Sequence, residues 1–419
     1  MNPIRCFVFV LSPLCLSIAL LSTPITSFAG DLAIMREVFV ERGDIPNPRV
    51  IVRTHANGFV IAGNHGDKEA WATRVDAEGR IEWRYVKPVQ RSFEGGPNYS
   101  SAAVMPDDSV FLCGTYPVNG SHGLLAHLDK AGMVLNEESL YPTDGHLAVA
   151  RFDACMPWQH GVAIVGVAWR PLKTPRPAKL AGGPPIFTEP FYWVMAVDGD
   201  GKVKWEKLIP IDENGGIDEM AIFHQPLADG GFLFTGVGKN TGTEIIHVGR
   251  KGDVLAKAVF PAEALTPVQP IDDKDRTFQL ASTGTEKFTV ITLNKDLQEV
   301  KRLSERHERG RIYTAYRMPD QSLVLFGTHR LPANYEAWVM KLNPTLQDEQ
   351  DLYFPPPNAN IWIRAAVPLD TPGDFATARL VAPSNLSWKD EYEIINGREK
   401  KGAGIGLTAV HVNYNEKQQ

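Results

Sequence analysis

The sequence predicts an all-β fold, a β-propeller of about seven four-stranded blades in which an N-terminal strand closes the last blade. Three observations predict this fold. A strand hairpin recurs along the chain, its copies keep the spacing of propeller blades, and the two chain ends supply complementary numbers of strands. A repeat architecture also explains how 419 residues form one domain, although this length alone would suggest two or three.

The repeated hairpin is clearest between Gly58 and Trp83. The segment GFVIAG is a short apolar strand that ends at Gly63, and AWATRVD alternates apolar and polar residues up to Asp76. The turn Ala77–Gly79 then leads into RIEWRYV, which alternates again. Period-two alternation bounded by Gly, Asn and Asp is typical of strands joined by hairpins.

Six further copies of this unit follow, two of them degraded. In four of the six steps, the ends of successive third strands lie 45 to 53 residues apart, which is the spacing of propeller blades. The other two steps span 69 and 70 residues because each contains an insertion. The third strands end at Asp76, Asp129, Asp198, Gly249, Asn294, Asn343 and Asn413.

The two ends of the chain predict how the ring closes. The last copy stops at Asn413, which leaves no room for a fourth strand, whereas Ala33–Val40 is a spare alternating strand before the first copy. Pairing the spare strand with the incomplete blade would remove an open sheet edge. We therefore predict one propeller domain over residues 30–419, with insertions at 168–190 and 382–404.

The repeated unit resembles a repeat of secreted bacterial propellers, of the WD-like or quinoprotein type. Its pattern is Gly-Gly-aromatic, an apolar strand, Gly, and then a Trp-containing strand that ends in Asp-x-x-Gly-x-x-x-Trp. Asp229–Phe232 and Gly236 match the first half, and Trp71–Trp83 and Trp193–Trp205 match the second. The resemblance implies a propeller in which this Trp packs between blades, and it implies no particular function. Four copies lack the Trp of this pattern and carry Asn136, Ala256, Lys301 and Gln350 in its place. Because these copies match the repeat less well, the predicted number of blades is about six to eight.

Residues 1–29 read as an export signal. Arg5 provides a positive start, Cys6–Leu21 is an apolar run, and Ala29 ends a stretch typical of a signal peptidase site. The alternative is an N-terminal membrane anchor, but the apolar run is shorter than the roughly 20 residues that a spanning helix needs. We expect a periplasmic or secreted protein whose mature chain has no membrane span.

The charge of the chain argues against two classes of partner, and its cysteine content leaves open whether a disulfide forms. The net charge is −6, and no basic stripe is present, so we expect neither nucleic acid nor an anionic membrane surface as a partner. After removal of the signal, Cys113 and Cys155 remain. Export permits a disulfide between them, but strand geometry must also suit it, so two small buried residues in strands are the favoured interpretation.

The two insertions predict where a partner binds. Both fall between the second and third strands of their blades, so both should lie on one face of the ring, where loops on a rigid scaffold carry binding residues. A link between blades and the innermost strands border the same face. The candidate binding residues are Trp169, Arg170, Lys173 and Arg176 in the first insertion, Trp388 and Tyr392 in the second, Arg91 in a link and Arg364 on an innermost strand.

Sequence motifs for catalysis are absent. We find no His-Glu-x-x-His zinc motif, no phosphate-binding glycine loop and no Gly-x-Ser-x-Gly elbow, so no catalytic residue, metal ligand or cofactor is assigned. The histidines are scattered over separate repeats. Several polar residues are expected to line the centre of the ring: Arg53, Arg151, Asp153, Glu219, Tyr313, Arg317 and Arg364.

The expected function is that of an exported, non-catalytic binding module. It would present one propeller face to a protein or polysaccharide and act as a monomer. One alternative is a propeller enzyme with its site at the mouth of the central channel, either carbohydrate-active or, with less support, quinoprotein-like. A structural scaffold of the cell envelope is the third interpretation.

Overall fold

The computed structural model describes most of the chain after residue 31. The described ranges are 32–42, 46–65, 68–88, 96–117, 121–144, 147, 149–176, 186–211, 222–227, 229–238, 242–260, 266–269, 278–283, 287–294, 296–306, 310–330, 335–345, 348–354, 359–370, 374–383 and 404–412. Within these ranges the chain forms 28 strands and no helix. It follows that these ranges contain no apolar helix of membrane-spanning length.

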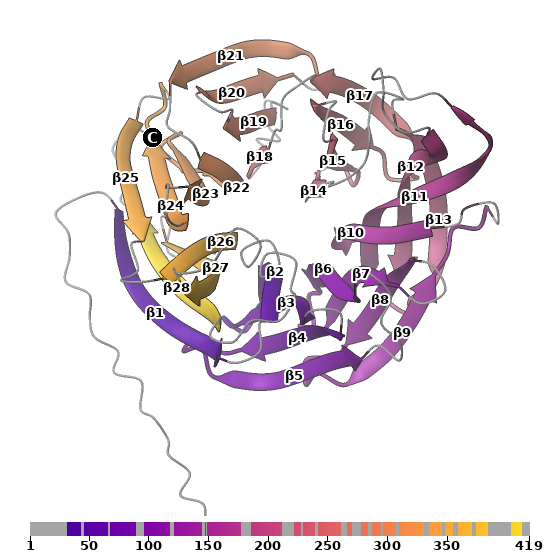
Figure 1. Cartoon of the computed structure of the whole chain (residues 1–419), viewed down its shortest axis with the longest axis horizontal. Coiled ribbons are helices and arrows are strands. Elements are labelled where there is room, and N and C mark those ends of the chain that lie inside the picture. The colour runs from indigo at the N-terminus through magenta and orange to yellow at the C-terminus, as the bar shows by residue number, and fades with distance from the viewer. Residues whose placement is uncertain are drawn as a thin grey trace, which may run out of the picture.

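The strands form sheets arranged as a ring, which is the architecture of a β-propeller (Figure 1). In each blade the first strand is innermost and the last is outermost, and neighbouring strands are antiparallel. The first blade contains β2 (Pro46–Arg53), β3 (Phe59–His65), β4 (Glu69–Val75) and β5 (Ile81–Pro88). The second contains β6 (Asn98–Val104), β7 (Val110–Tyr116), β8 (His122–Leu128) and β9 (Val134–Leu140).

Two further four-stranded blades follow along the chain. One contains β10 (Val149–Trp158), β11 (Gly161–Arg176), β12 (Ile186–Asp198) and β13 (Val203–Pro210). The next contains β14 (Ile222–Pro226), β15 (Phe232–Gly238), β16 (Gly242–Val248) and β17 (Val254–Phe260).

The next eight strands belong to one continuous sheet. Its first half contains β18 (Thr266–Gln269), β19 (Phe278–Thr283), β20 (Lys287–Leu293) and β21 (Glu299–Arg306). Its second half contains β22 (Gly310–Arg317), β23 (Leu323–Arg330), β24 (Tyr335–Leu342) and β25 (Asp348–Phe354). A short parallel pairing of β18 with β22 joins the halves. The structure therefore contains five separate four-stranded blades and one eight-stranded sheet, against the prediction of about seven blades.

The last blade is completed by the N-terminal strand, as the sequence predicted. It contains β26 (Ala359–Pro368), β27 (Asp374–Pro383), β28 (Gly404–Val412) and β1 (Leu32–Arg42). Strand β1 pairs antiparallel with β28 from Leu32 opposite Val412 to Arg42 opposite Gly404. This pairing joins the first and last described strands of the chain, so β1 and not β28 forms the outer edge of the blade.

The hydrophobic core lies between neighbouring blades. One cluster joins β3 and β4 to β6, β7 and β8, and the next joins β7 and β8 to β10, β11 and β12. Strands β3 and β4 are buried on both faces, whereas the outer strand β5 alternates between exposed and half-buried residues. The middle strands are therefore mostly apolar, because each is covered by a blade on both sides.

The tryptophans of the repeat dock on the next blade, as the resemblance implied. A Cβ placed on Gly132 would lie 2.7 Å from the ring of Trp83, and one on Gly252 would lie 2.7 Å from Trp205. Both glycines have positive φ, so they suit the turn and also leave space for the indole. Where Asn136 replaces the Trp, its side-chain amide donates to the carbonyl of Asp200 at 3.3 Å, so a polar contact replaces the aromatic one.

A β-bulge recurs in the innermost strand of five blades, and in three of them it explains a glycine on the second strand. In β10, Phe152 pairs with Gly166 and Ala154 pairs with Val165, so Asp153 has no cross-strand partner. A Cβ on Gly166 would lie 2.0 Å from the carbonyl oxygen of Arg151. The residues without a cross-strand partner at the five bulges are Arg49, Ser100, Asp153, Tyr313 and Arg364. Bulges re-aim side chains, and here they act on the strands that surround the axis of the ring.

Candidate functional site

The first insertion extends a β-hairpin beyond its blade (Figure 1). Strands β11 and β12 contain 16 and 13 residues, whereas the matching strands of the first two blades contain 7. Their pairing continues through Arg170 opposite Glu189 and Pro171 opposite Thr188, and Arg176 still pairs with Ile186. The base of the insertion is thus an ordered ladder, whereas the sequence predicted a long loop.

Two of the predicted binding residues, Trp169 and Arg170, lie at the base of this hairpin on opposite faces of the strand. Trp169 packs at the margin of the cluster shared with β14–β17, and it is half-buried. Arg170 points the other way, toward the segment that links β9 to β10. Successive side chains on a strand alternate between faces, so the hairpin presents a different group to each neighbouring blade.

On the face of the strand that carries Trp169, an arginine lies beside the indole ring and a buried carboxyl group pairs with that arginine. The guanidinium carbon of Arg151 lies 5.5 Å from the centre of the Trp169 ring, which is within the range of a cation–π contact. The same guanidinium pairs with the bulge residue Asp153, with 3.0 Å between Nε and Oδ1. Burial raises the pKa of the Asp153 carboxyl above its usual value, and Arg151 opposes this rise.

On the Arg170 side, the guanidinium is held between two acids and an aromatic ring. Arg170 Nη2 lies 2.7 Å from Asp144 Oδ2, and Nη1 lies 3.5 Å from Glu189 Oε2. The guanidinium carbon lies 4.6 Å from the centre of the Phe191 ring. About a third of the Arg170 side chain is exposed, so this charge is oriented but still accessible.

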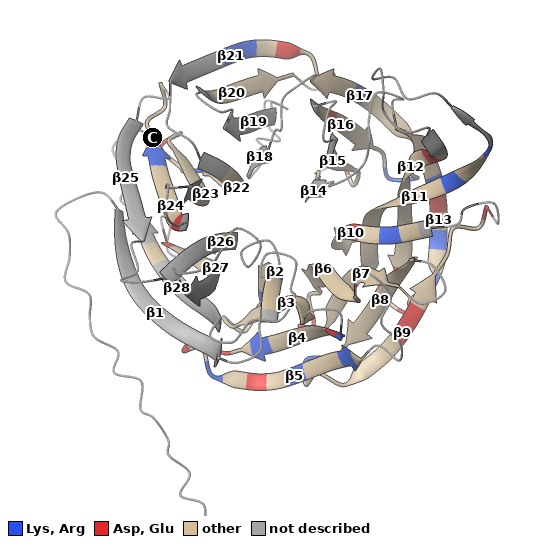
Figure 2. Ribbon diagram, viewed as in Figure 1, with Lys and Arg blue, Asp and Glu red and all other residues tan. Residues whose placement is uncertain are grey.

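These seven residues form what we call the hairpin-base cluster: Arg151, Asp153, Trp169, Arg170, Phe191, Asp144 and Glu189. Figure 2 shows the basic residues of β10 and β11 where the hairpin leaves the ring. Lys173 is exposed further along β11. Arg176 lies on the same strand, and its side chain is outside the described structure.

The other predicted binding residues are not brought into this cluster. Arg91, Trp388 and Tyr392 lie outside the described residues, and Arg364 is the bulge residue of β26, whose side chain is also not described. Sequence reasoning placed Arg151 and Asp153 near the centre of the ring but did not join them to Trp169. It missed Asp144, Glu189 and Phe191. Gly166 was an available signal, because a glycine inside a strand often marks a bulge in its neighbour.

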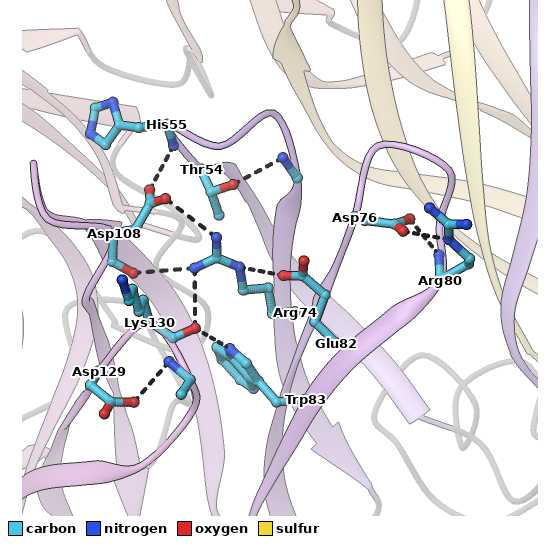
Figure 3. A network of polar contacts seen from close by, with 12 residues as sticks. Thr54, His55, Arg74, Asp76, Arg80, Glu82, Trp83, Asp108, Asp129 and Lys130 are labelled. Carbon is cyan, nitrogen blue, oxygen red and sulfur yellow. Dashed lines mark hydrogen bonds and ion pairs between the residues drawn. The ribbon is translucent and has the colours of Figure 1, made fainter.

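The opposite ends of the blades carry a different polar network, which connects blades to each other (Figure 3). Arg74 on β4 is almost fully buried and pairs with Glu82 at 2.7 Å and with Asp108 of the next blade at 3.3 Å. Its guanidinium also donates to the Lys130 carbonyl, which accepts the indole N–H of Trp83. The same repeat position carries His127 on β8, His247 on β16 and Lys341 on β24.

The second blade places an acid, a serine and a histidine in contact at this end, but not in a catalytic order. His127 Nε2 lies 3.0 Å from Ser109 Oγ, and Asp107 accepts a hydrogen bond from Ser109, not from the histidine. The His127 ring also forms a hydrogen bond with the Gly199 backbone. A nucleophilic serine needs the acid behind the histidine and an exposed hydroxyl, whereas Ser109 is 3% exposed. We therefore interpret this set as structural.

Metal binding finds no support in the part of the chain that the structure describes. Within it, no three His, Cys, Asp or Glu side chains lie close enough together to hold a metal ion.

Comparisons with known proteins show resemblance of fold and no family. The chain matches no protein-family model and no curated protein. It is similar to BBS1N in its complex with ARL6DN, at 10% identity over 93% of this chain and 99% of that one, with a TM-score of 0.48. It is also similar to Sqt1 from Chaetomium thermophilum (10% identity, 90% and 98% covered, TM-score 0.44) and to the polysaccharide lyase Uly1 (9%, 88% and 90%, 0.49). The likeness is one of fold alone.

Proposed function

We propose that this chain is an exported, non-catalytic binding module whose hairpin-base cluster holds a protein or polysaccharide partner. The observation that carries the proposal is the β11–β12 extension, which continues past the blade and fixes two arginine–aromatic pairs at its base. Arginine and tryptophan are the residue types that contribute most to binding energy when they sit in ordered, partly buried positions.

The strand ladder supports this role because it lowers the entropic cost of binding. Trp169 and Arg170 are paired through the backbone with Pro190 and Glu189, so their positions are set before a partner arrives. Such preorganisation increases affinity mainly by reducing what must be ordered on association. The Arg170 guanidinium remains partly exposed although it pairs with Asp144 and Glu189. A carboxylate, sulfate or phosphate of a partner would compete with these two acids for its N–H donors.

The wider setting of the module is part of the same proposal. We infer that the eight-stranded sheet corresponds to two blades, since each half is a four-stranded meander and only Val268–Gln269 pair with Ala315–Tyr316 across the junction. The ring then has seven blades. Residues 1–29 direct the chain to the periplasm or the medium, where it acts as a monomer.

A second candidate function rests on Asp153. Its buried carboxyl has a raised pKa and lies beside an arginine and a tryptophan on an innermost strand, which is a suitable environment for a general acid. A carbohydrate-active propeller would place a second carboxylate about 5 to 10 Å away. The substitution Asp153→Asn distinguishes the two functions. It would abolish turnover of a polysaccharide by an enzyme, but it would leave binding of a partner by Trp169 and Arg170 largely intact.

The experiment that tests the binding proposal shortens the hairpin. Residues Trp169–Pro190, which include Trp169, Arg170 and Glu189 of the cluster, are replaced by Asn-Gly, a turn that suits the antiparallel pair Ala168–Phe191. The full chain and this variant are compared on a polysaccharide array and against envelope proteins of the source cells. We expect unchanged circular dichroism and loss of the specific ligand. Arg80→Ala, at the opposite end of a blade, is the matched control and should retain it. A ligand bound equally by the shortened variant would contradict the proposal.

A further inference from the structure

Cys113 and Cys155 face each other across the boundary between two blades. Cys113 lies on β7 and Cys155 on β10, and both belong to one core cluster in which neither is exposed. The thiol of Cys113 is in hydrogen-bonding contact with that of Cys155. Neither cysteine is part of a disulfide in this structure.

Hydrogen bonds fix the backbone positions of this pair. Ser101 lies directly opposite Cys113 in the β6–β7 ladder. Its hydroxyl accepts the backbone N–H of Cys155 at 3.0 Å and lies 3.2 Å from the Cys155 carbonyl. On the neighbouring residue, Ser100 Oγ donates to the Phe152 carbonyl at 2.6 Å. Two serines of one blade therefore hold β10 of the next blade at a set distance from Cys113.

We propose that Cys113 and Cys155 are a disulfide site that links the β6–β9 blade to the β10–β13 blade. The contact between their side chains, together with the hydrogen bonds that tie the Cys155 backbone to Ser101, the cross-strand partner of Cys113, places both cysteines within the reach that a disulfide requires. The bridge would close the chain segment from 113 to 155 and would fasten the blade that carries the hairpin-base cluster. It does not depend on the proposed binding function.

The reaction is a thiol–disulfide exchange with a small-molecule or protein disulfide as the oxidant. One cysteine thiolate attacks a sulfur of the donor disulfide to form a mixed disulfide and release one donor thiol. The second cysteine then attacks the mixed disulfide, which forms the Cys113–Cys155 bond and releases the second donor thiol. The donor gains the two electrons and the two protons that the cysteines lose. Burial raises the pKa of the Cys113 thiol, so the exchange belongs to folding, before the blades pack.

Refolding in a glutathione redox buffer tests this site. The full chain carries Cys6→Ser and Cys15→Ser, so that only Cys113 and Cys155 remain. After refolding and unfolding in the presence of an alkylating reagent, we expect no alkylation and an intact mass about 2 Da below that of the reduced chain. The melting temperature of the oxidised chain should exceed that of the reduced chain by about 5 °C, because the bridge restricts the unfolded chain.

Two variants keep the test decisive. Cys113→Ala and Cys155→Ala should each fold, carry one thiol, and melt at the same temperature with and without reductant. The proposal is overturned if the refolded parent chain alkylates at both cysteines or carries only mixed disulfides with glutathione. It is also overturned if the bridged chain melts no higher than the reduced chain.

Discussion

At the residue scale, three glycines on second strands are determined by one close backbone contact. Gly63, Gly114 and Gly166 each lie opposite the residue that precedes a bulge, and the bulge turns a carbonyl oxygen toward the position of a Cβ. For Gly114 the distance would be 1.7 Å, to the carbonyl oxygen of Asn98. Since that oxygen belongs to the backbone, it moves only if the strand moves.

We therefore expect Gly114→Ala to destabilise the chain by about 3 kcal/mol, the upper part of the range for an overpacked interior. The measurement is the free energy of unfolding in urea. Gly199→Ala is the control, because its added Cβ would lie 3.1 Å from the nearest atom, the carbonyl of His160. If both variants lose the same stability, the bulge is not the reason for the glycine.

Buried His127 predicts a pH dependence. Burial lowers the pKa of this imidazole below the usual 6.5, while Asp107, Asp200 and the Gly199 backbone oppose the shift. In the window just below pH 6.5 the unfolded chain therefore binds a proton that the folded chain does not, so the free energy of unfolding falls as the pH falls.

His127→Gln should flatten that part of the profile. The free energy of unfolding would be measured from about pH 8 to about pH 5, the range around the imidazole pKa. His55→Gln, at an exposed position, should keep the steeper slope of the parent chain. Equal slopes for the parent chain and His127→Gln would refute this assignment.

Much of the residue-scale detail could not be predicted from the sequence. The repeated glycines were visible in the sequence, but a tight turn and a neighbouring bulge both select glycine. The sequence interpretation assigned a turn at Gly79 and predicted no bulge. His127 and His247 were counted as scattered, although they occupy one repeat position. That equivalence depends on the register of β8 and β16, which the structure provides and a search for local motifs does not.

At the scale of elements, the strands were predictable and the ends of the hairpins were not. Apolar runs, alternation and turn residues predicted nearly every blade strand. A middle strand packed between two blades is mostly apolar, and an outer strand with one exposed face alternates. The extension of β11 and β12 was predicted as a loop, since Pro171, Pro175 and the basic residues suppress the strand pattern. In the folded hairpin, backbone pairing between β11 and β12 stabilises the strand conformation that this composition disfavours. The sequence of β11 alone does not show that this pairing occurs.

The network around Arg74 gives an element-scale prediction about how blades hold together. Arg74 is 6% exposed and Asp108 is 14% exposed, so removal of the guanidinium leaves an uncompensated carboxylate between two blades. We expect Arg74→Met to lower the free energy of unfolding by about 3 kcal/mol, as is usual when one partner of a buried ion pair is removed.

The control for that substitution is Arg80→Met, which removes an exposed pair with Asp76 on the outside of the same blade. Exposed pairs are well solvated, so little change is expected. Urea denaturation of both variants provides the comparison. An equal effect at the two positions would show that the buried network does not hold the blades together.

At the scale of the whole molecule, the ring was predicted by counting strands. A surplus strand at one end and a missing strand at the other require β1 to pair with β28, and this pairing is found. The number of blades was less predictable, because the β18–β22 pairing merges two meanders into one sheet. The prediction that Trp169 and Arg170 bind a partner stays a prediction. The residues that surround them come from the β9–β10 link, from β10 and from β12, and they become neighbours of β11 only when the blade folds.

The central claim is that the hairpin-base cluster is where a partner binds, and one measurement tests it most directly. The affinity of the first specific ligand found for the full chain is measured for the parent chain, for the double variant Trp169→Ala/Arg170→Ala and for the control Arg80→Ala. Loss of two such anchor residues should weaken binding by about 100-fold or more, while the control stays within about twofold of the parent. If the double variant, folded and as stable as the parent, binds with the parent's affinity, the partner binds elsewhere and the proposed site is wrong.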